Sequence, residues 1–262
     1  MSVIETKNLT FRYRNTSPLV LDEINVDLER GKMVVLLGLN GSGKTTLIKL
    51  LAGLYCPTEG KILYEGRSLE EYSIPERSKR IAYVAQKTEK ADDYSVLEYL
   101  LLGTVNRTRF YEVPSQKTVK EVKEVAEHLG ITYLLDKKFG EISGGERQIV
   151  SVASAIAQNT DVVLLDEPTS ALDICNQYKV LSVLKELCET DGKTIVFSTH
   201  NPNHALYLNA DVYLLRQGRI EDADCARRIV TPEKLKPVYG DRICYSSDLP
   251  YQEISFYDKT YF

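Results

Sequence analysis

The stretch Gly38-Leu-Asn-Gly-Ser-Gly-Lys-Thr-Thr46 decides the fold of this 262-residue chain. It fits the phosphate-binding pattern G-x-x-x-x-G-K-[ST], whose fixed positions are Gly38, Gly43, Lys44 and Thr45. The apolar, β-branched run at 32–37 predicts a buried strand before the loop. Residues 46–52 are good helix formers and predict a helix after it. Strand, glycine loop and helix follow one another in the order that phosphate binding requires.

The residue types in the loop suit a bound nucleotide. Glycines let backbone N–H groups turn inward around phosphates, and the helix N-terminus adds a partial positive charge behind them. Lys44 would reach the β- and γ-phosphates, and the Thr45 hydroxyl would hold Mg²⁺. The alternative is a plain glycine-rich turn without a ligand.

A second strand ends in two acids. The run at 161–165 is apolar and leads into Asp166 and Glu167, which is typical of a parallel strand buried on both faces. Ligands in open α/β sheets bind beyond the carboxyl ends of the strands. We therefore expect Asp166 near Mg²⁺ through water, and Glu167 as the group that polarises the attacking water, a role that contributes about 10²–10⁴-fold. The alternative is a strand capped by solvated acids.

A third segment, Ile142-Ser-Gly-Gly-Glu-Arg-Gln148, opens an apolar helix at 149–157. Ser143 and Glu146 have the spacing of a capping box. Two glycines in a first turn are poor helix formers, but they are explained if a phosphate approaches the backbone there. The alternative is a well-capped buried helix and nothing more.

With these segments the chain resembles the nucleotide-binding subunit of ATP-binding cassette (ABC) transporters. GLNGSGKTT resembles the family's Walker A loop, VVLLDE its Walker B strand and SGGERQ its signature sequence. In order along the chain, Gln86 matches the glutamine loop, 170–173 the D-loop and His200 the switch histidine. Tyr13 stands where the family places an aromatic that stacks on adenine. The resemblance covers about Val3 to Gly240.

The resemblance implies a set of site residues. The residues with a catalytic role would be Glu167, His200, Gln86 and Lys44. The residues around ATP would be Tyr13, Gly38, Asn40, Gly41, Ser42, Gly43, Lys44, Thr45, Thr46, Asp166, Ser143, Gly144, Gly145, Glu146 and Asp173. The residues around Mg²⁺ would be Thr45, Gln86 and Asp166.

The resemblance also implies an architecture. The fold would be an α/β P-loop NTPase cassette, with a mostly parallel core sheet, an antiparallel β subdomain and a helical subdomain that carries the signature. The ATP-binding domain would cover 1–240, with the helical subdomain at about 87–157 and a tail of unassigned role at 241–262. Cassettes of the family work as homodimers in the ATP-bound state, where Ser143, Gly144 and Gly145 of one chain would bind the γ-phosphate held by the other.

Composition limits the classes of function. A net charge of −4 gives no electrostatic argument for nucleic acid. No apolar run approaches the roughly 20 residues that span a bilayer, and no N-terminal signal pattern is visible. The five dispersed cysteines contain no C-x-x-C pair and indicate reduced thiols. We expect a peripheral protein on the cytoplasmic face of the membrane, whose membrane-spanning permease is a separate polypeptide.

Local matches favour one branch of the family. The segments 94–97, 170–174 and 231–235 resemble cassettes that energise import of iron–siderophore complexes, haem or cobalamin, with an extracytoplasmic substrate-binding protein as an indirect partner. Two positions depart from the pattern: Asn201 follows the switch histidine where many relatives have Asp, and Ile142 replaces Leu. Related cassettes serve molybdate, and an exporter subunit or a soluble non-transport ATPase stays open as an alternative.

Further patterns predict local elements. Residues 61–67 read as a hairpin that turns at Glu65-Gly66. Thr118 and Glu121 have capping-box spacing for an amphipathic helix that ends at Gly130, although a start one turn earlier at Ser115 is also compatible. Tyr94 lies outside the apolar stripe of the next predicted helix and is our candidate for a permease contact.

Overall fold

The computed structural model describes residues 1–86, 91–107, 113–240, 243–246 and 253–256. Parts of two predicted segments therefore lie outside the described residues: 87–90 and 108–112 of the helical subdomain, and much of the tail at 241–262. The chain divides into two compact units, residues Met1–Glu70 with Val196–Phe262, and residues Glu71–Ile195.

The first unit contains an antiparallel sheet around a long N-terminal strand. Its strands are β1 (Ser2–Phe11), β2 (Leu21–Ile24), β3 (Asp27–Glu29), β5 (Glu59–Tyr64) and β6 (Arg67–Ser68). β5 and β6 form the predicted hairpin, since Tyr64 pairs with Arg67. Glu65 and Gly66 have φ values of 49° and 81°, as a two-residue type I′ turn requires.

The first unit also holds the strand that leads into the phosphate loop. β4 (Met33–Leu37) is buried at every residue, and it lies parallel to β10 (Asp211–Arg216). β11 (Arg219–Cys225) closes this edge antiparallel to β10. β9 (Thr194–Thr199), also buried throughout, runs from the second unit into the first. The strand predicted before the phosphate loop is thereby confirmed, as is the burial of parallel strands on both faces.

Short helices complete the first unit. They are α1 (Lys44–Leu51), α7 (Pro202–Leu208), α8 (Ala226–Ile229) and α9 (Pro232–Tyr239), followed by the hairpin of β12 (Ile243–Ser246) and β13 (Glu253–Phe256). Thr231 caps α9, with Pro232 at the first position, because proline has no N–H to lose there.

In the second unit, β7 (Ile81–Val84) and β8 (Val162–Asp166) pair in parallel from Ile81 opposite Val162. This confirms the strand expected before the paired acids. Helix α6 (Ile174–Asp191) follows, capped by Asp173. The remaining short elements of this unit are α2 (Ile74–Ser78) and the 3₁₀ turns η2 (Val105–Arg107), η3 (Thr132–Leu134) and η4 (Phe139–Glu141). The 3₁₀ turn η1 (Leu69–Glu71) includes the boundary between the two units, since only Glu71 belongs to the second.

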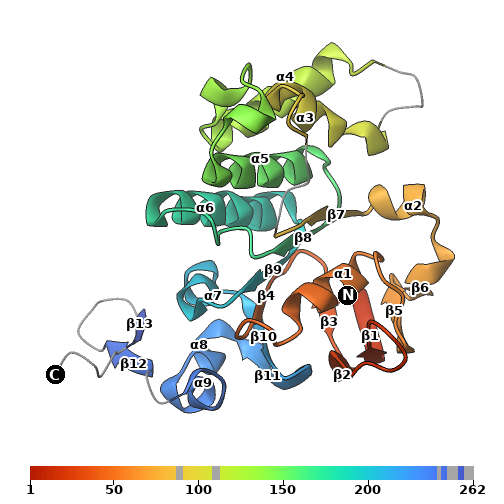
Figure 1. Ribbon diagram of the computed structural model, residues 1–262, viewed down its shortest axis with the longest axis vertical. Coiled ribbons are helices and arrows are strands. Elements are labelled where there is room, and N and C mark those ends of the chain that lie inside the picture. The colour runs from red at the N-terminus through yellow and green to blue at the C-terminus, as the bar shows by residue number, and fades with distance from the viewer. Residues whose placement is uncertain (87–90, 108–112, 241–242, 247–252, 257–262) are drawn as a thin grey trace. The chain divides into compact units, whose positions relative to one another are not determined.

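Three helices of the second unit pack on one another: α3 (Val96–Leu102), α4 (Gln116–His128) and α5 (Gly144–Ala157) (Figure 1). Val96 and Leu100 of α3 are fully buried, as their helical spacing predicts. No helix in the described part of the chain is both long and apolar enough to span a membrane.

The start of α4 corrects one prediction. Ser115 is the N-cap, and its Oγ accepts a hydrogen bond from the Thr118 N–H. The capping box at Thr118 is therefore wrong, and the earlier start is confirmed. The physical reason is that the hydroxyl one turn upstream already satisfies the open N–H groups, while Glu121 forms an ion pair with Arg107 instead.

Candidate nucleotide-binding site

The phosphate loop requires glycine at two of its fixed positions. A Cβ on Gly38 would lie 2.4 Å from the Leu215 carbonyl oxygen, which leaves no room for any side chain. Gly43 has a φ of 107°, and a Cβ there would lie 2.7 Å from Leu21 Cδ2. Packing against β10 and β2 therefore fixes the path of the loop, and the two glycines are needed whether or not a ligand is bound.

Lys44 is directed back into its own loop. Its side chain is 4% exposed, and Nζ donates hydrogen bonds to the carbonyls of Gly38 at 2.9 Å and Leu39 at 3.0 Å. A cation is thus held at the N-terminus of α1. This arrangement suits a phosphate, because the cation and the helix N-terminus both attract an anion.

The N-terminus of α1 has no side-chain cap. Its N-cap residue is Gly43, and no acid lies in the first turn. The Ser42 hydroxyl is buried and has no hydrogen-bond partner among the residues described. Asn40 and Gly41 are exposed on the outer side of the loop. Helix N–H groups without a side-chain cap, beside a buried hydroxyl and a fixed cation, are the features of an anion site.

Tyr13 stands beside the start of α1. Its OH and the Thr46 Oγ1 lie 2.9 Å apart, within hydrogen-bond distance. The edges and faces of Tyr13, Phe11 and Tyr55 pack together, with centroids 5.1–5.8 Å apart. Yet Tyr13 remains 53% exposed. An aromatic ring that is held at its rim and open to solvent suits stacking on a planar base.

The paired acids of the second unit are buried. Asp166 is fully buried at the end of β8, and Glu167 is 7% exposed. Gln86 Nε2 donates a hydrogen bond to Glu167 Oε2 at 3.1 Å, joining residues that are 81 positions apart. Glu167 has a φ of 46°, a conformation that costs a non-glycine residue about 1–3 kcal/mol and is found mostly at functional sites. Burial argues against the alternative of solvated acids.

The segment 143–148 begins α5 with the predicted capping box. The Ser143 N–H donates to Glu146 Oε2 at 2.8 Å, and the Glu146 N–H donates to Ser143 Oγ at 3.3 Å. Tyr133 OH donates to Glu146 Oε1 at 3.2 Å. The backbone hydrogen bond from Ser143 lowers the pKa of Glu146, so this carboxylate stays charged at neutral pH.

The two glycines of this turn have different surroundings. A Cβ on Gly145 would lie 3.2 Å from the Ala171 carbonyl, whereas a Cβ on Gly144 would meet nothing within 4 Å. Residues 143, 145 and 146 line a pocket of about 250 Å³ together with 171–173. Asp173 faces this pocket and caps α6 by accepting from the Asn176 N–H at 2.9 Å. Close packing against the Ala171 carbonyl explains why residue 145 is a glycine. Gly144, in contrast, has open space where a side chain would be.

His200 follows β9 and is exposed. Tyr239 OH donates to its carbonyl oxygen at 3.0 Å, and the Gly38 N–H donates to the carbonyl of the preceding Thr199 at 3.3 Å. Tyr239 here and Tyr133 at Glu146 are not among the site residues predicted from the sequence. Both contacts join residues distant in sequence, and no local pattern signals them.

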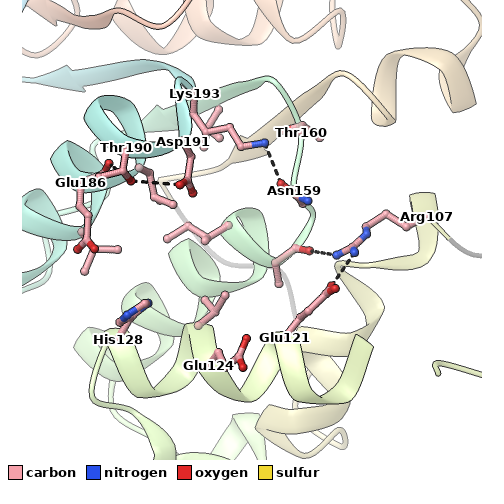
Figure 2. Close-up of a pocket in the computed structure, with 16 residues that line it drawn as sticks. Arg107, Glu121, Glu124, His128, Asn159, Thr160, Glu186, Thr190, Asp191 and Lys193 are labelled. Atoms are coloured by element: carbon pink, nitrogen blue, oxygen red, sulfur yellow. Dashed lines mark hydrogen bonds and ion pairs between the residues drawn. The ribbon is translucent and has the colours of Figure 1, made fainter. Parts of the chain in front are cut away.

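A groove of about 290 Å³ lies elsewhere in the second unit, and none of its described lining residues is a predicted site residue. Figure 2 shows Glu121, Glu124 and His128 of α4 on one side and Glu186, Thr190 and Asp191 of α6 on the other. Lys193 donates to Asn159 Oδ1 at 2.8 Å, and Arg107 pairs with Glu121.

The predicted residues thus fall into two groups. The phosphate loop, Tyr13 and His200 belong to the first unit, whereas Gln86, the paired acids, the turn at 143–146 and Asp173 belong to the second. Within the second unit, packing brings Gln86 to Glu167 and places the turn at 143–146 beside the segment 171–173.

Comparison with known proteins shows the family of the chain. Residues 21–170 match the family described as ABC transporter. The chain belongs to this family. It is therefore an ABC-type ATPase, and its segment 143–148, which resembles the family's signature sequence, is called the signature turn below.

Relatives support the assignment along most of the chain. The molybdate import ATP-binding protein MolC of Haemophilus influenzae is 34% identical over 90% of this chain and 87% of its own length. The solved structure of a metal-chelate type ABC transporter in an inward-facing conformation is 30% identical, with a TM-score of 0.83 over 100% of this chain and 99% of its own. A dimeric bacterial ABC transporter cassette is 28% identical, with a TM-score of 0.79 over 86% and 99%.

Proposed function

We propose that this ABC ATPase is the energy-supplying subunit of an importer for a metal chelate, of the iron–siderophore, haem or cobalamin class. The observation that carries this proposal is the likeness of the whole chain to a metal-chelate type transporter. The chain would act as a peripheral protein at the cytoplasmic face of the membrane, on separate permease subunits, with an extracytoplasmic substrate-binding protein as an indirect partner.

The proposed roles are assigned to the two groups of predicted site residues, one in each unit. Lys44 and the N-terminus of α1 would hold the β- and γ-phosphates, and Tyr13 would stack on adenine. Glu167 would take the proton of the attacking water, in a position set by Gln86 through the hydrogen bond of 3.1 Å. A buried base held in this way suits general base catalysis.

The donors present also fit Mg²⁺, which prefers hard oxygen ligands. Thr45 would contribute its hydroxyl and Asp166 its carboxylate, the latter through water. Gln86 directs its amide nitrogen at Glu167, so its carbonyl oxygen is the atom that would face the metal. When bound, Mg²⁺ would neutralise charge on the β- and γ-phosphates.

Two copies would form the working unit in the ATP-bound state. The signature turn, through Ser143, Gly144 and Gly145, would bind the γ-phosphate held by the other chain, and Glu146 and Asp173 would line the same site. The open space at Gly144 supports this role, because a phosphate can approach the backbone there.

Uptake in proteoliposomes tests the proposal. The chain, its permease and the binding protein are reconstituted, and import of ferric siderophore, haem, cobalamin or molybdate is measured with ATP inside or outside. ATP-dependent uptake of one of the first three is the expected result. Import of molybdate alone contradicts the cargo class, export contradicts the direction, and a chain that binds no permease contradicts the transport role.

A single variant tests the permease contact. Tyr94 is 48% exposed and lies outside the buried stripe of α3. Tyr94→Ala is expected to leave ATP binding unchanged while co-purification with the permease falls about thirtyfold, because aromatic anchors dominate such interfaces. Tyr207→Ala, an exposed tyrosine of α7, is the matched control. Normal complex yield in the Tyr94 variant contradicts the contact.

A further inference from the structure

The residues that flank His200 belong to a small hydrogen-bonded network. Thr199 lies at the end of β9, Asn201 caps α7, and His204 lies in the first turn of that helix. His204 is 3% exposed, and its ring packs edge-on against Phe197, with centroids 5.9 Å apart. This buried imidazole, one helical turn after His200, takes no part in the ATPase mechanism proposed above.

The helix cap fixes the orientation of the Asn201 amide. Its Oδ1 accepts from the Asn203 N–H at 3.0 Å, so Nδ2 is the atom that faces His204 Nε2 at 3.2 Å. An amide nitrogen can only donate. His204 Nε2 must therefore accept, which is possible only when this nitrogen carries no proton.

The other ring nitrogen completes the assignment. His204 Nδ1 lies 3.2 Å from Thr199 Oγ1, and the same oxygen accepts from the Asn201 N–H at 3.0 Å. With Nε2 as acceptor, the neutral ring carries its proton on Nδ1 and donates it to Thr199. The Thr199 hydroxyl thus links both chain neighbours of His200, Thr199 and Asn201, to the buried ring of His204. These hydrogen bonds hold the backbone on either side of His200.

A second proton on His204 would face a donor. The Nε2–H of an imidazolium would point at the Asn201 N–H groups, and burial opposes the charge as well. Burial and, to a lesser extent, the charge of His200 together lower the pKa of His204 to about 4. Of the elements packed on α7, β4 carries no titratable residue, α8 carries the exposed Arg227 and Arg228, and the side chains of β13 are outside the described part.

We propose that Asn201 and His204 are a positioning pair for His200, in which the Asn201 amide holds His204 as a neutral Nδ1–H imidazole. The loop that carries His200 is then held by an imidazole that stays neutral and is hydrogen-bonded at both ring nitrogens. This inference rests on the catalytic role that the family resemblance implies for His200. It gives Asn201 a specific function, because an acid at this position would accept from His204 instead of donating to it.

Nitrogen-detected histidine spectra test the pair directly. The chain has 3 histidines, so His128→Gln and His200→Gln variants assign all the ring signals. In the wild type, His204 is expected to show the Nδ1–H pattern without titration between about pH 5 and pH 8. Titration of His204 in that range, or an Nε2–H pattern, overturns the proposal.

Asn201→Asp is the decisive variant. The aspartate keeps the helix cap but turns the group that faces Nε2 into an acceptor, so His204 is expected to become Nε2–H or imidazolium with a raised pKa. The pH profile of ATP hydrolysis should then gain an inflection that is absent in the wild type and absent again in Asn201→Asp/His204→Gln. An unchanged tautomer and pKa in Asn201→Asp contradict the pair.

Two controls keep the outcomes separate. Asn201→Ser retains a cap oxygen but offers no amide donor, so its His204 should lose the fixed tautomer without gaining an ion pair. If Asn201→Asp does not fold, the histidine spectra of the wild type and of Asn201→Ser still show whether Asn201 fixes the tautomer of His204. The histidine spectra test the positioning pair and need no ATP. ATP hydrolysis by His200→Ala tests the proposed role of His200. A failure of the pair can therefore be distinguished from a failure of the proposed role.

Discussion

The phosphate loop and the signature turn are both glycine-rich starts of helices, and the structure treats them in opposite ways. The phosphate loop has left-handed glycines, no side-chain cap and a buried hydroxyl without a partner among the described residues. The signature turn has a complete capping box, and neither Gly144 nor Gly145 has a positive φ. The phosphate loop of a single chain is therefore open to an anion, whereas the signature turn caps its helix with its own side chains.

The difference shows what a glycine-rich motif does and does not specify. In the phosphate loop, glycine is required by packing and by backbone conformation at Gly38 and Gly43. In the signature turn only Gly145 is closely packed, and Gly144 has open space where a side chain would be. We infer that the phosphate loop supplies its binding groups by itself, and that the signature turn supplies a surface to a ligand held by another copy.

The largest effect is expected at the cation of the phosphate loop. Lys44→Ala should weaken ATP binding and lower turnover by about 10³-fold or more, as for loss of a fixed electrostatic group at a transferring phosphate. Lys49→Ala, on the same helix α1, is the matched control. Phosphate release and nucleotide titration measure both, and equal behaviour of the two variants contradicts the special role of Lys44.

Glu167→Gln should separate binding from chemistry. The shape is kept while the base is removed, so hydrolysis should fall by about 10²-fold or more. ATP binding should persist and a dimer should accumulate, which size-exclusion chromatography with and without ATP detects. Glu189→Gln, an exposed change on α6, should behave as the wild type. Wild-type hydrolysis by Glu167→Gln removes this residue from the mechanism.

A pair of glycine substitutions tests the comparison itself. Gly43→Ala should destabilise the protein by about 1–3 kcal/mol, because its φ of 107° strains any other residue. Gly144→Ala should leave stability equal or raise it by up to about 1 kcal/mol, since alanine is the better helix former. The same Gly144 variant should lose ATP-driven dimerisation. Denaturant melts and chromatography measure the two effects, and a dimer that forms normally argues against the open space at Gly144 as a phosphate site.

The smallest effects are expected at two serines. Ser143→Ala removes a helix cap and should cost about 1 kcal/mol of unfolding free energy. Ser42→Ala removes a buried hydroxyl without a described partner, so stability should not fall, whereas ATP affinity should. Urea unfolding and nucleotide titration of both variants give the answer. A large stability loss at Ser42 would show that its hydroxyl supports the loop rather than a ligand.

The sequence by itself determined the features that depend on neighbours within a few residues. The capping boxes, the Glu65-Gly66 turn, the buried strands and the glycine loop all follow from local sterics and hydrogen bonding, and the structure contains them. Even the wrong capping box at Thr118 concerned only which of two nearby hydroxyls, that of Ser115 or that of Thr118, caps α4. The roles of the site residues and the division into domains remain predictions from the resemblance.

Only the tertiary structure decided the contacts that join distant residues. Gln86 reaches Glu167, Tyr133 reaches Glu146, and the Ala171 carbonyl limits Gly145, because strand pairing and helix packing set their positions. The tautomer of His204 depends in the same way on the direction of one amide and on the burial of one ring. Sequence patterns repeat over a helical turn or a strand pair, and they carry no information about which distant atoms meet.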